Sequence, residues 1–205
     1  MKPIIVLAIL AACSGRTAPI ERIPAPQPAQ PGPALATTEL EAASPAAAPG
    51  PSIYDLPIQL RDADDRTVGL DVARGKPVLI SMFYASCPVA CPVLVAEIGQ
   101  VIAALPPELQ RDIRVVLVSF DPDRDTPAKL HELARERRLD ERWTLAVASE
   151  PDARALAAVL GVKYRKLDNG EFFHGSTIVV LDSEGRPVAR TDSLGQRATL
   201  IAAIR

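Results

Sequence analysis

The chain has few aromatic residues and few cysteines, and neither positive nor negative charge is in large excess. Phe, Trp and Tyr make up 4% of its 205 residues, so a folded core must be built mainly from Val, Leu, Ile and Ala. Three cysteines are too few for a disulfide-stabilised scaffold. The formal net charge of -2 offers no basic excess for nucleic acid and no acidic block for cations. The length fits one globular domain with additional sequence.

The N-terminal residues are typical of an export signal. A single lysine precedes an apolar run at residues 4–10, which is too short to span a bilayer because a spanning helix needs about 20 apolar residues. The run continues into Leu-Ala-Ala followed by Cys13, which resembles a bacterial lipoprotein signal. We therefore expect residues 1–12 to be a lipoprotein signal peptide and Cys13 to be acylated, anchoring the protein in the cell envelope, facing the periplasm. The alternative is an ordinary signal peptide with an incidental cysteine. The choice between inner and outer membrane stays open.

A segment rich in Pro and Ala follows, at residues 13–52. It contains few large apolar side chains, so it cannot build a core of its own. We expect it to be an extended, semi-stiff tether that joins the membrane anchor to a folded domain of residues 53–205. Such a tether would let the domain search the space near its membrane.

Beyond residue 53, short apolar strands alternate with helical segments. Hairpins are expected at residues 58–70, around an Asp-rich turn, and at residues 177–190. Buried strands are expected at residues 77–84, 113–120 and 143–148, and helices at residues 88–104, 126–138, 151–160 and 195–204. Alternating strands and helices followed by a late hairpin predict an α/β fold with a mixed sheet.

Cys87 and Cys91 are candidates for a reactive site, because they lie at the expected start of a helix after a buried strand. The free N–H groups and dipole of a helix N-terminus stabilise a thiolate, and Pro88 suits the first turn. Cysteines four positions apart would share one helical face, with Cα atoms about 6 Å apart, close enough for a disulfide or a shared metal ion. The three-residue gap favours chelation, and thiolates favour Cu(I), with Zn(II) as the competitor. Two buried structural cysteines or a passive disulfide are the alternative.

Two thiolates leave room for a third ligand, and the chain has only two histidines. His131 lies in the middle of an expected helix among charged residues and is expected to be a solvated surface residue. His174 lies in a loop that enters an apolar strand, where a neutral imidazole can complete a trigonal Cys₂His site. A surface-loop histidine is the alternative for His174.

Several motifs occur in a fixed order along residues 56–203. They are the expected opening hairpin, the Gly-Lys-Pro-Val-Leu-Ile segment at 75–80, Cys-Pro-Val-Ala-Cys-Pro at 87–92, Ser-Phe-Asp-Pro-Asp-Arg-Asp-Thr-Pro at 119–127, and His174 ahead of an apolar strand and a Gly-Arg turn. Together they resemble the SCO/SenC family of copper-site assembly proteins. The combination is specific, although each motif alone is not.

The resemblance implies a thioredoxin-like fold with a mixed central sheet flanked by helices, an N-terminal β-hairpin and an inserted hairpin. It implies a copper site, for Cu(I) or Cu(II), made by Cys87, Cys91 and His174. It also implies a metallochaperone, rather than an enzyme, that delivers copper to or assembles the CuA centre of a respiratory cytochrome c oxidase. The expected partners are the oxidase subunit with the CuA site, other envelope copper chaperones and thioredoxin-like reductants. The alternative is a thiol-disulfide oxidoreductase in which Cys87 and Cys91 are the catalytic pair.

Three further positions carry specific expectations. Phe173 precedes His174 where many family members carry Asp, which removes one obvious hydrogen-bond partner for the imidazole. Asp121 either ends a strand in a turn, or orients a ligand or meets a partner near the copper site. Asp125 and Thr126 are expected to cap the following helix.

Overall fold

The computed structural model describes residues 50–87 and 90–205, without the side chains of Ala90 and Cys91. The expected signal peptide, the lipidation site Cys13 and nearly all of the tether lie outside the described residues. Within the described part of the chain, no helix is long and apolar enough to span a membrane.

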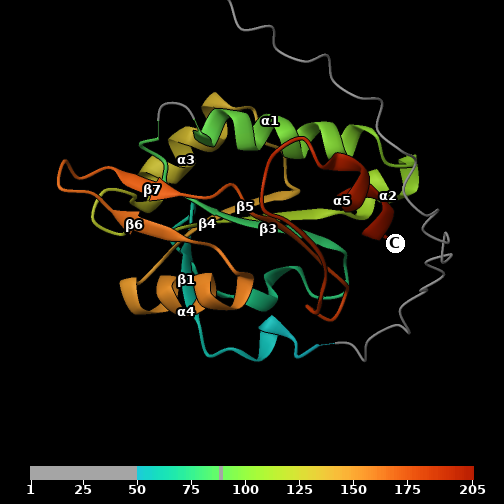
Figure 1. The fold of residues 1–205 in the computed structure, drawn as a ribbon, viewed down its shortest axis with the longest axis horizontal. Helices are drawn as coiled ribbons and strands as arrows, with labels where there is room; N and C mark the ends of the chain where they lie inside the picture. The colour runs from blue at the N-terminus through green and yellow to red at the C-terminus, as the bar shows by residue number, and fades with distance from the viewer. Residues whose placement is uncertain (1–49, 88–89) are drawn as a thin grey trace, which may run out of the picture. The chain divides into compact units, whose positions relative to one another are not determined.

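A mixed sheet of seven strands, in the order β2-β1-β5-β4-β3-β8-β9, forms the centre of the domain (Figure 1). Its middle consists of three parallel strands: β3 (Val78–Phe83), β4 (Arg114–Ser119) and β5 (Trp143–Ala148). All six residues of β3 are buried, as expected for a strand that is covered on both faces. The three apolar runs of the sequence therefore form the strands that were expected of them.

Antiparallel hairpins complete both sides of the sheet. On one side β1 (Gln59–Asp62) pairs with β5 and with β2 (Thr67–Gly69). On the other side β8 (Ile178–Leu181) pairs with β3 and with β9 (Pro187–Thr191). The prediction of an α/β fold with a mixed sheet is confirmed.

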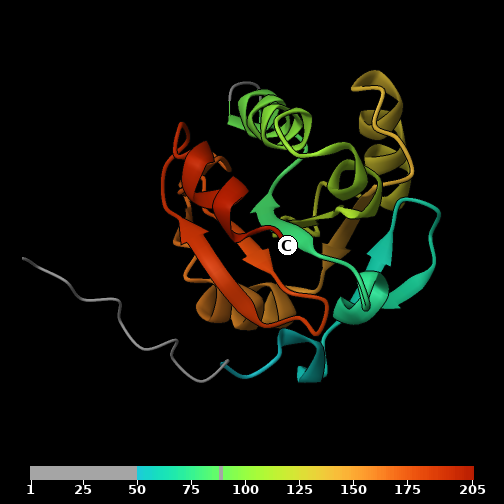
Figure 2. The same ribbon diagram turned by 90° about the vertical axis from the view of Figure 1, so that its right-hand side faces the viewer.

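Helices cover both faces of the sheet (Figures 1 and 2). The parallel strands β3, β4 and β5 follow one another across the sheet in chain order. Right-handed crossovers therefore place the helices that connect them on one face. This face carries α1 (Ala90–Ala103), α2 (Pro107–Asp112), α3 (Pro127–Glu136) and α5 (Arg197–Ala203). The other face carries α4 (Glu150–Leu160) and two 3₁₀ turns, η1 (Ile53–Asp55) and η2 (Leu70–Ala73).

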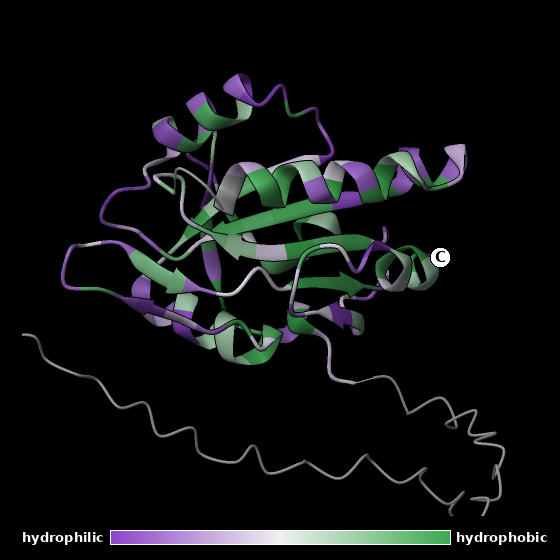
Figure 3. Cartoon of the chain, turned by 45° about the horizontal axis from the view of Figure 1, so that its top comes forward, coloured by the Kyte–Doolittle hydropathy of each residue, from purple (hydrophilic) through white to green (hydrophobic). Residues whose placement is uncertain are grey.

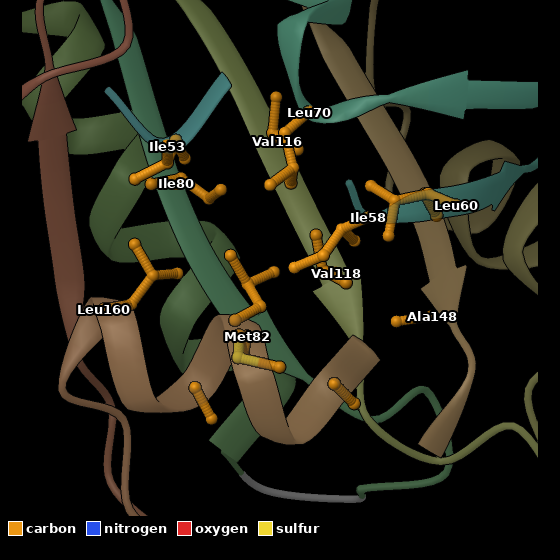
Figure 4. Close-up of a cluster of buried hydrophobic side chains, with 14 of the residues drawn as sticks. Ile53, Ile58, Leu60, Leu70, Ile80, Met82, Val116, Val118, Ala148 and Leu160 are labelled. Atoms are coloured by element: carbon orange, nitrogen blue, oxygen red, sulfur yellow. The ribbon is translucent and has the colours of Figure 1, made fainter. Parts of the chain in front are cut away.

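Alternate residues of the central strands fill two apolar cores. Along β3, Ile80 and Met82 belong to the core beneath α4, whereas Leu79 and Phe83 belong to the core beneath α1 and α3. Figure 4 shows the first core, where side chains of β3 and β4 meet those of α4 and the 3₁₀ turns. Figure 3 shows the strands as hydrophobic and much of the outer helical surface as hydrophilic. Val, Leu, Ile and Ala dominate both cores, as the scarcity of aromatic residues predicts.

A second, two-stranded sheet lies apart from the main one. It consists of β6 (Tyr164–Lys166) and β7 (Phe172–His174), which pair antiparallel between α4 and β8. The resemblance implied an inserted hairpin, and this is where the structure has it. The sequence patterns did not indicate β6 and β7, nor α2, because elements of three to six residues are too short to show a hydrophobic period.

The two hairpins of the main sheet close with the same side-chain contacts. At the end of the first strand of each, an aspartate accepts hydrogen bonds from the backbone N–H groups two and four residues later. The distances are 3.0 and 2.9 Å for Asp62, and 2.9 and 2.8 Å for Asp182. Asp65 and Gly185 take the left-handed positions, with φ of 66° and 79°. The Asp-rich turn of the sequence is thus a local hydrogen-bonded unit.

Gly185 gives a test of this turn. Its positive φ already disfavours a side chain, at about 1–2 kcal/mol, and an added Cβ would lie 2.5 Å from the Tyr54 ring. The ring cannot withdraw easily, because the neighbouring Ile53 N–H donates to the Gly185 carbonyl at 2.9 Å. Gly75→Ala is the matched control, since φ there is 86° and nothing lies within 4 Å of an added Cβ. We expect urea denaturation to show a larger loss of unfolding free energy for Gly185→Ala; equal losses would contradict the contact with Tyr54.

Candidate metal and thiol site

Three segments that are distant in the sequence meet at the carboxyl edge of the parallel strands. β3 and β4 end side by side, with Phe83 opposite Ser119, so the segments that follow them leave the sheet together. β8 runs antiparallel to β3 with Ile178 opposite Ser81, so the residues before β8 arrive at the same edge. The Ser81 hydroxyl donates to the Thr177 carbonyl at 2.6 Å and holds this approach. Open α/β sheets bind ligands and place reactive groups at this edge.

Cys87 lies half-buried in the turn after β3 and packs against both apolar cores. Its N–H donates to the Tyr84 carbonyl at 3.2 Å, which closes the turn. Cys87 itself is not helical, in keeping with a helix expected to start at residue 88. Pro88 and the side chain of Cys91 lie outside what the structure describes, so the approach of the two sulfurs stays a prediction.

His174 lies in β7, where it pairs with Tyr164, and not in a loop as expected. Its ring centroid is 5.5 Å from those of both Tyr84 and Phe120. Its Nδ1 lies 3.1 Å from the carbonyl oxygen of Gly175. Because a carbonyl only accepts, this contact assigns a proton to Nδ1, and in the neutral form of the ring it leaves the Nε2 lone pair for a metal or another donor. The backbone thus supplies the partner that the absence of Asp at position 173 seemed to remove.

An aromatic cluster holds the hairpin β6–β7 against the sheet edge. Tyr84 and Phe120 follow β3 and β4, whereas Tyr164 and Phe172 belong to the hairpin. The closest pair is Phe120 and Tyr164, stacked with centroids 4.5 Å apart, and Tyr84 and Phe172 lie 5.2 Å apart. Rings at these separations attract each other beyond the effect of burial. The cluster therefore joins the strand that carries His174 to the turn that carries Cys87.

Asp125 fixes the turn after β3 from inside the protein. Only 1% of it is exposed, and its Oδ2 accepts from the Ala85 N–H at 2.7 Å and the Ser119 hydroxyl at 2.5 Å. Burial raises the pKa of Asp125 above its usual value, and the two hydrogen bonds oppose that rise. Thr126 caps α3 by accepting from the Lys129 N–H at 3.3 Å, as expected. The expectation that Asp125 also caps was wrong, because its carboxylate is taken up by the buried turn.

A row of charges connects β4 with the hairpin. The buried Asp121 carboxylate pairs with Arg124, and Arg124 Nη1 lies 3.3 Å from Oε1 of Glu171. The Tyr84 hydroxyl donates to Oε2 of Glu171 at 2.8 Å. These hydrogen bonds, that of Tyr84 first, hold the pKa of Glu171 below its usual value. Burial, followed by hydrogen bonding to Glu171 and to Cys87, raises the pKa of Tyr84. Since Asp121 is 1% exposed, its burial favours orienting neighbours over meeting a partner.

The family model for SCO1/SenC matches residues 46–205, which include all three segments of this site. The chain belongs to the SCO1/SenC family. A putative copper-binding protein of Stutzerimonas stutzeri is 29% identical over 73 residues, which cover 36% of this chain and 36% of that protein. The chain thus matches about a third of the length of this relative.

Solved structures of the family share the fold. The SCO1/SenC family lipoprotein from Bacillus anthracis str. Ames superposes with a TM-score of 0.64 at 22% identity, covering 73% of this chain and 92% of its own. Arabidopsis thaliana ScoI with copper bound superposes with a TM-score of 0.63 at 21% identity, covering 75% and 93%. The thioredoxin-like fold expected from the resemblance is therefore confirmed.

The candidate ligands of this SCO1/SenC chain are brought together only in part. Cys87 and His174 both contact Tyr84, the sulfur through its hydroxyl and the imidazole through its ring. Among the side chains that the structure describes, which leave out that of Cys91, no three His, Cys, Asp or Glu groups are placed to hold a metal ion. His131 has a side chain 64% exposed, as expected of a surface residue.

Sequence reasoning did not single out Tyr84, Arg124 or Glu171. Tyr84 ends an apolar run and Arg124 lies within the motif at 119–127, so neither position has a signal of its own. A glutamate three residues before His174 was a visible signal, but strand geometry does not say which distant group it meets. Only the packing of the hairpin places Glu171 on the Tyr84 hydroxyl.

Asp125 gives a test of how the turn is held. Asp125→Ala leaves the Ala85 N–H and the Ser119 hydroxyl without their acceptor, so we expect a loss of about 1–3 kcal/mol of unfolding free energy. Asp125→Asn keeps one oxygen for both donors and should retain most of the stability. Urea denaturation of both variants measures the difference, and equal losses would show that the acceptor is dispensable.

The pH dependence of the same pair tests the burial of the carboxylate. Because the folded-state pKa of Asp125 is raised, the folded protein binds a proton more tightly than the unfolded chain. Stability should therefore rise as pH falls from the raised pKa towards the ordinary carboxyl value, and be lost again as pH rises. Asp125→Asn should lack this component, so the stability of the wild type relative to Asp125→Asn should increase on acidification through that window. A constant difference would contradict a raised pKa.

Proposed function

We propose that this protein binds copper through Cys87, Cys91 and His174 and delivers it to the CuA centre of a respiratory cytochrome c oxidase. The observation that carries the proposal is that Cys87 and His174, from opposite ends of the domain sequence, both contact Tyr84. The Stutzerimonas relative is named as a copper-binding protein, and the Arabidopsis structure has copper bound, which supports the assignment.

The donor groups fit copper. Two thiolates and one imidazole suit Cu(I) in a trigonal arrangement, and they are also ligands for Cu(II). The Nδ1 contact with Gly175 leaves Nε2 of His174 as the ligating atom and fixes the direction of the ring. The aromatic rings of Tyr84 and Phe120 beside the imidazole limit the access of water from that side.

Copper is the cargo in this function, so the site must release it. Cys87 and His174 are both half-buried, which lets a partner approach with ligands of its own and exchange them one at a time. Oxidation of the two cysteines to a disulfide would expel copper, because a disulfide sulfur is no longer a thiolate ligand. Thioredoxin-like reductants would therefore be needed to keep the carrier loaded.

A thiol-disulfide oxidoreductase is the second candidate. The observation that favours it is the contact of the half-buried Cys87 with the Tyr84 hydroxyl at the carboxyl edge of a thioredoxin-like sheet, the edge at which such sheets place reactive groups. One thiolate would attack a partner disulfide and release a partner thiolate. The second thiolate would then displace the remaining partner sulfur, so that the partner gains two electrons and Cys87 and Cys91 become a disulfide.

The place of action follows from the expected lipid anchor at Cys13. An acylated cysteine and the tether would hold the domain at the periplasmic face of an envelope membrane. The Bacillus anthracis relative is described as a lipoprotein, which supports this placement. The subunit that carries the CuA site, and other envelope copper chaperones, are the proposed partners.

Copper titration of the reduced full chain, followed by optical spectroscopy, tests the function. We expect one copper ion per chain, lost when the cysteines are oxidised. Loss of a residue that supports a metal ligand typically weakens metal binding about 10–100-fold. His174→Ala removes a ligand itself, so it should weaken copper binding by more than that. His131→Ala, an exposed histidine on α3, is the matched control and should bind as the wild type does.

Disulfide exchange separates the two candidate functions. His174→Ala should still exchange with oxidised glutathione, because exchange needs the thiols and not the imidazole. Unchanged affinity and spectrum in His174→Ala would show that His174 is not a ligand. A reduced wild type that exchanges rapidly but takes up no copper would identify the oxidoreductase as the correct function.

A further inference from the structure

The hairpin that carries His174 is attached weakly to the main sheet by its backbone. β6 and β7 pair with each other and form a sheet of their own. Isolated two-stranded hairpins are marginally stable in water. The position of His174 relative to Cys87 therefore depends on side-chain contacts between the hairpin and the ends of β3 and β4.

Two kinds of side-chain contact join the hairpin to these ends. The aromatic cluster is apolar and holds the hairpin close, but rings can slide against one another at small cost. Two polar contacts fix its position: Lys166 with Asp123 at 2.9 Å, and Glu171 with both Tyr84 and Arg124. The side chains of Lys166 and Asp123 are 51% and 75% exposed, so solvent and salt screen that pair.

Although the Glu171 side chain is 41% exposed, it makes the stronger of the two contacts, because its partner Tyr84 is buried and because of its geometry. It lies immediately before β7, and its two carboxylate oxygens receive different donors, Oε2 the Tyr84 hydroxyl and Oε1 the Arg124 guanidinium. Tyr84 is 3% exposed, so its hydroxyl has little access to competing water. Arg124 is held in turn by the buried Asp121 carboxylate. A carboxylate with two held donors cannot shift without losing a charge-assisted hydrogen bond.

Tyr84 is the residue through which Glu171 reaches the candidate ligands. Its ring meets the His174 ring edge-on, with centroids 5.5 Å apart, and its hydroxyl also bonds to Cys87. The Arg124 guanidinium lies 5.4 Å from the centre of the Tyr84 ring and 5.7 Å from that of Phe172. One carboxylate therefore fixes the residue that contacts both the thiol and the imidazole.

We propose that Glu171 is a positioning residue, which sets the distance between His174 and Cys87 by binding the Tyr84 hydroxyl and the Arg124 guanidinium. Its effect on copper rests on the proposed function, whereas its hold on the hairpin does not. Glu171 touches no copper itself and acts through the placement of β7. The hairpin is thus locked in the geometry that brings the imidazole towards the thiol before any metal arrives.

The first measurement uses the metal-free full chain and backbone hydrogen exchange. The reporters are the N–H groups of Gly175 and Leu167, which bond within the hairpin at 3.0 and 2.7 Å. Glu171→Ala should speed their exchange by about tenfold, the change that losing a hydrogen bond to a charged group brings. Glu171→Gln keeps an acceptor for Tyr84 and should recover part of the protection. Amides of β3 and β4 should exchange as in the wild type.

Asp123→Asn is the matched control, because it removes the other ion pair that spans hairpin and sheet edge. Its hairpin amides should exchange at nearly the wild-type rate, since that pair is exposed. Tyr84→Phe removes the hydroxyl but keeps the ring against His174, so it should follow Glu171→Ala. If Glu171→Ala exchanged no faster than Asp123→Asn, Glu171 would not hold the hairpin and the proposal would be overturned.

The second measurement is copper affinity, with the optical spectrum of the loaded protein. Glu171→Ala and Tyr84→Phe should bind copper about 10–100-fold more weakly, as is typical when a group behind a ligand is lost, and with an altered spectrum. Asp123→Asn should match the wild type.

His174→Ala, measured in parallel, separates the positioning role of Glu171 from the proposed copper site. Wild-type copper binding in Glu171→Ala, with weak binding in His174→Ala, would overturn the positioning role and leave the function standing. Unchanged binding in His174→Ala would instead show that His174 is not a ligand, and hydrogen exchange alone would then decide the role of Glu171.

Discussion

The antiparallel pairing of β8 with β3 is the constraint on which the candidate site depends. β3 delivers Cys87 at its carboxyl end, and the antiparallel direction of β8 brings the preceding residues, with His174, to that same end. A parallel β8 would have placed the imidazole at the opposite edge. The Ser81 hydroxyl on the Thr177 carbonyl supports this pairing inside the core, where no water competes. The direction of β8 therefore decides whether Cys87 and His174 can meet at this edge. The chemistry of their side chains matters only once they are there.

The two cores and the candidate site are built from different kinds of side chain. Aliphatic side chains fill most of both faces of the sheet, whereas Tyr84, Phe120, Tyr164 and Phe172 gather at the edge where the candidate site lies. Large rings can bridge the gap between a separate hairpin and the sheet, which short aliphatic side chains cannot. The polar network of Asp121, Arg124 and Glu171 then gives this contact a single geometry, because charged hydrogen bonds are directional and dispersion is not.

Long elements were predictable because their signals are periodic or continuous. β3, β4 and β5 are mostly apolar runs, and a Thr-Pro pair marks the residue at which α3 begins. Asp125 shows the limit of local rules, since an aspartate before a helix is a common cap and here serves a buried turn instead. The hairpin β6–β7 shows another limit, because its three-residue strands are defined by partners across space and not by a pattern along the chain.

The sequence by itself determined the fold class, the order of the long elements and the family, and it predicted Cys87, Cys91 and His174 as the candidate ligands. These depend on composition, on hydrophobic period and on motifs, which are all properties read along the chain. Only the tertiary structure decided that His174 lies in a strand, that Gly175 directs the imidazole, and that Glu171 joins the hairpin to Tyr84. The physical reason is that hydrogen bonds between distant segments depend on strand direction and side-chain packing, and neither leaves a mark in the local sequence.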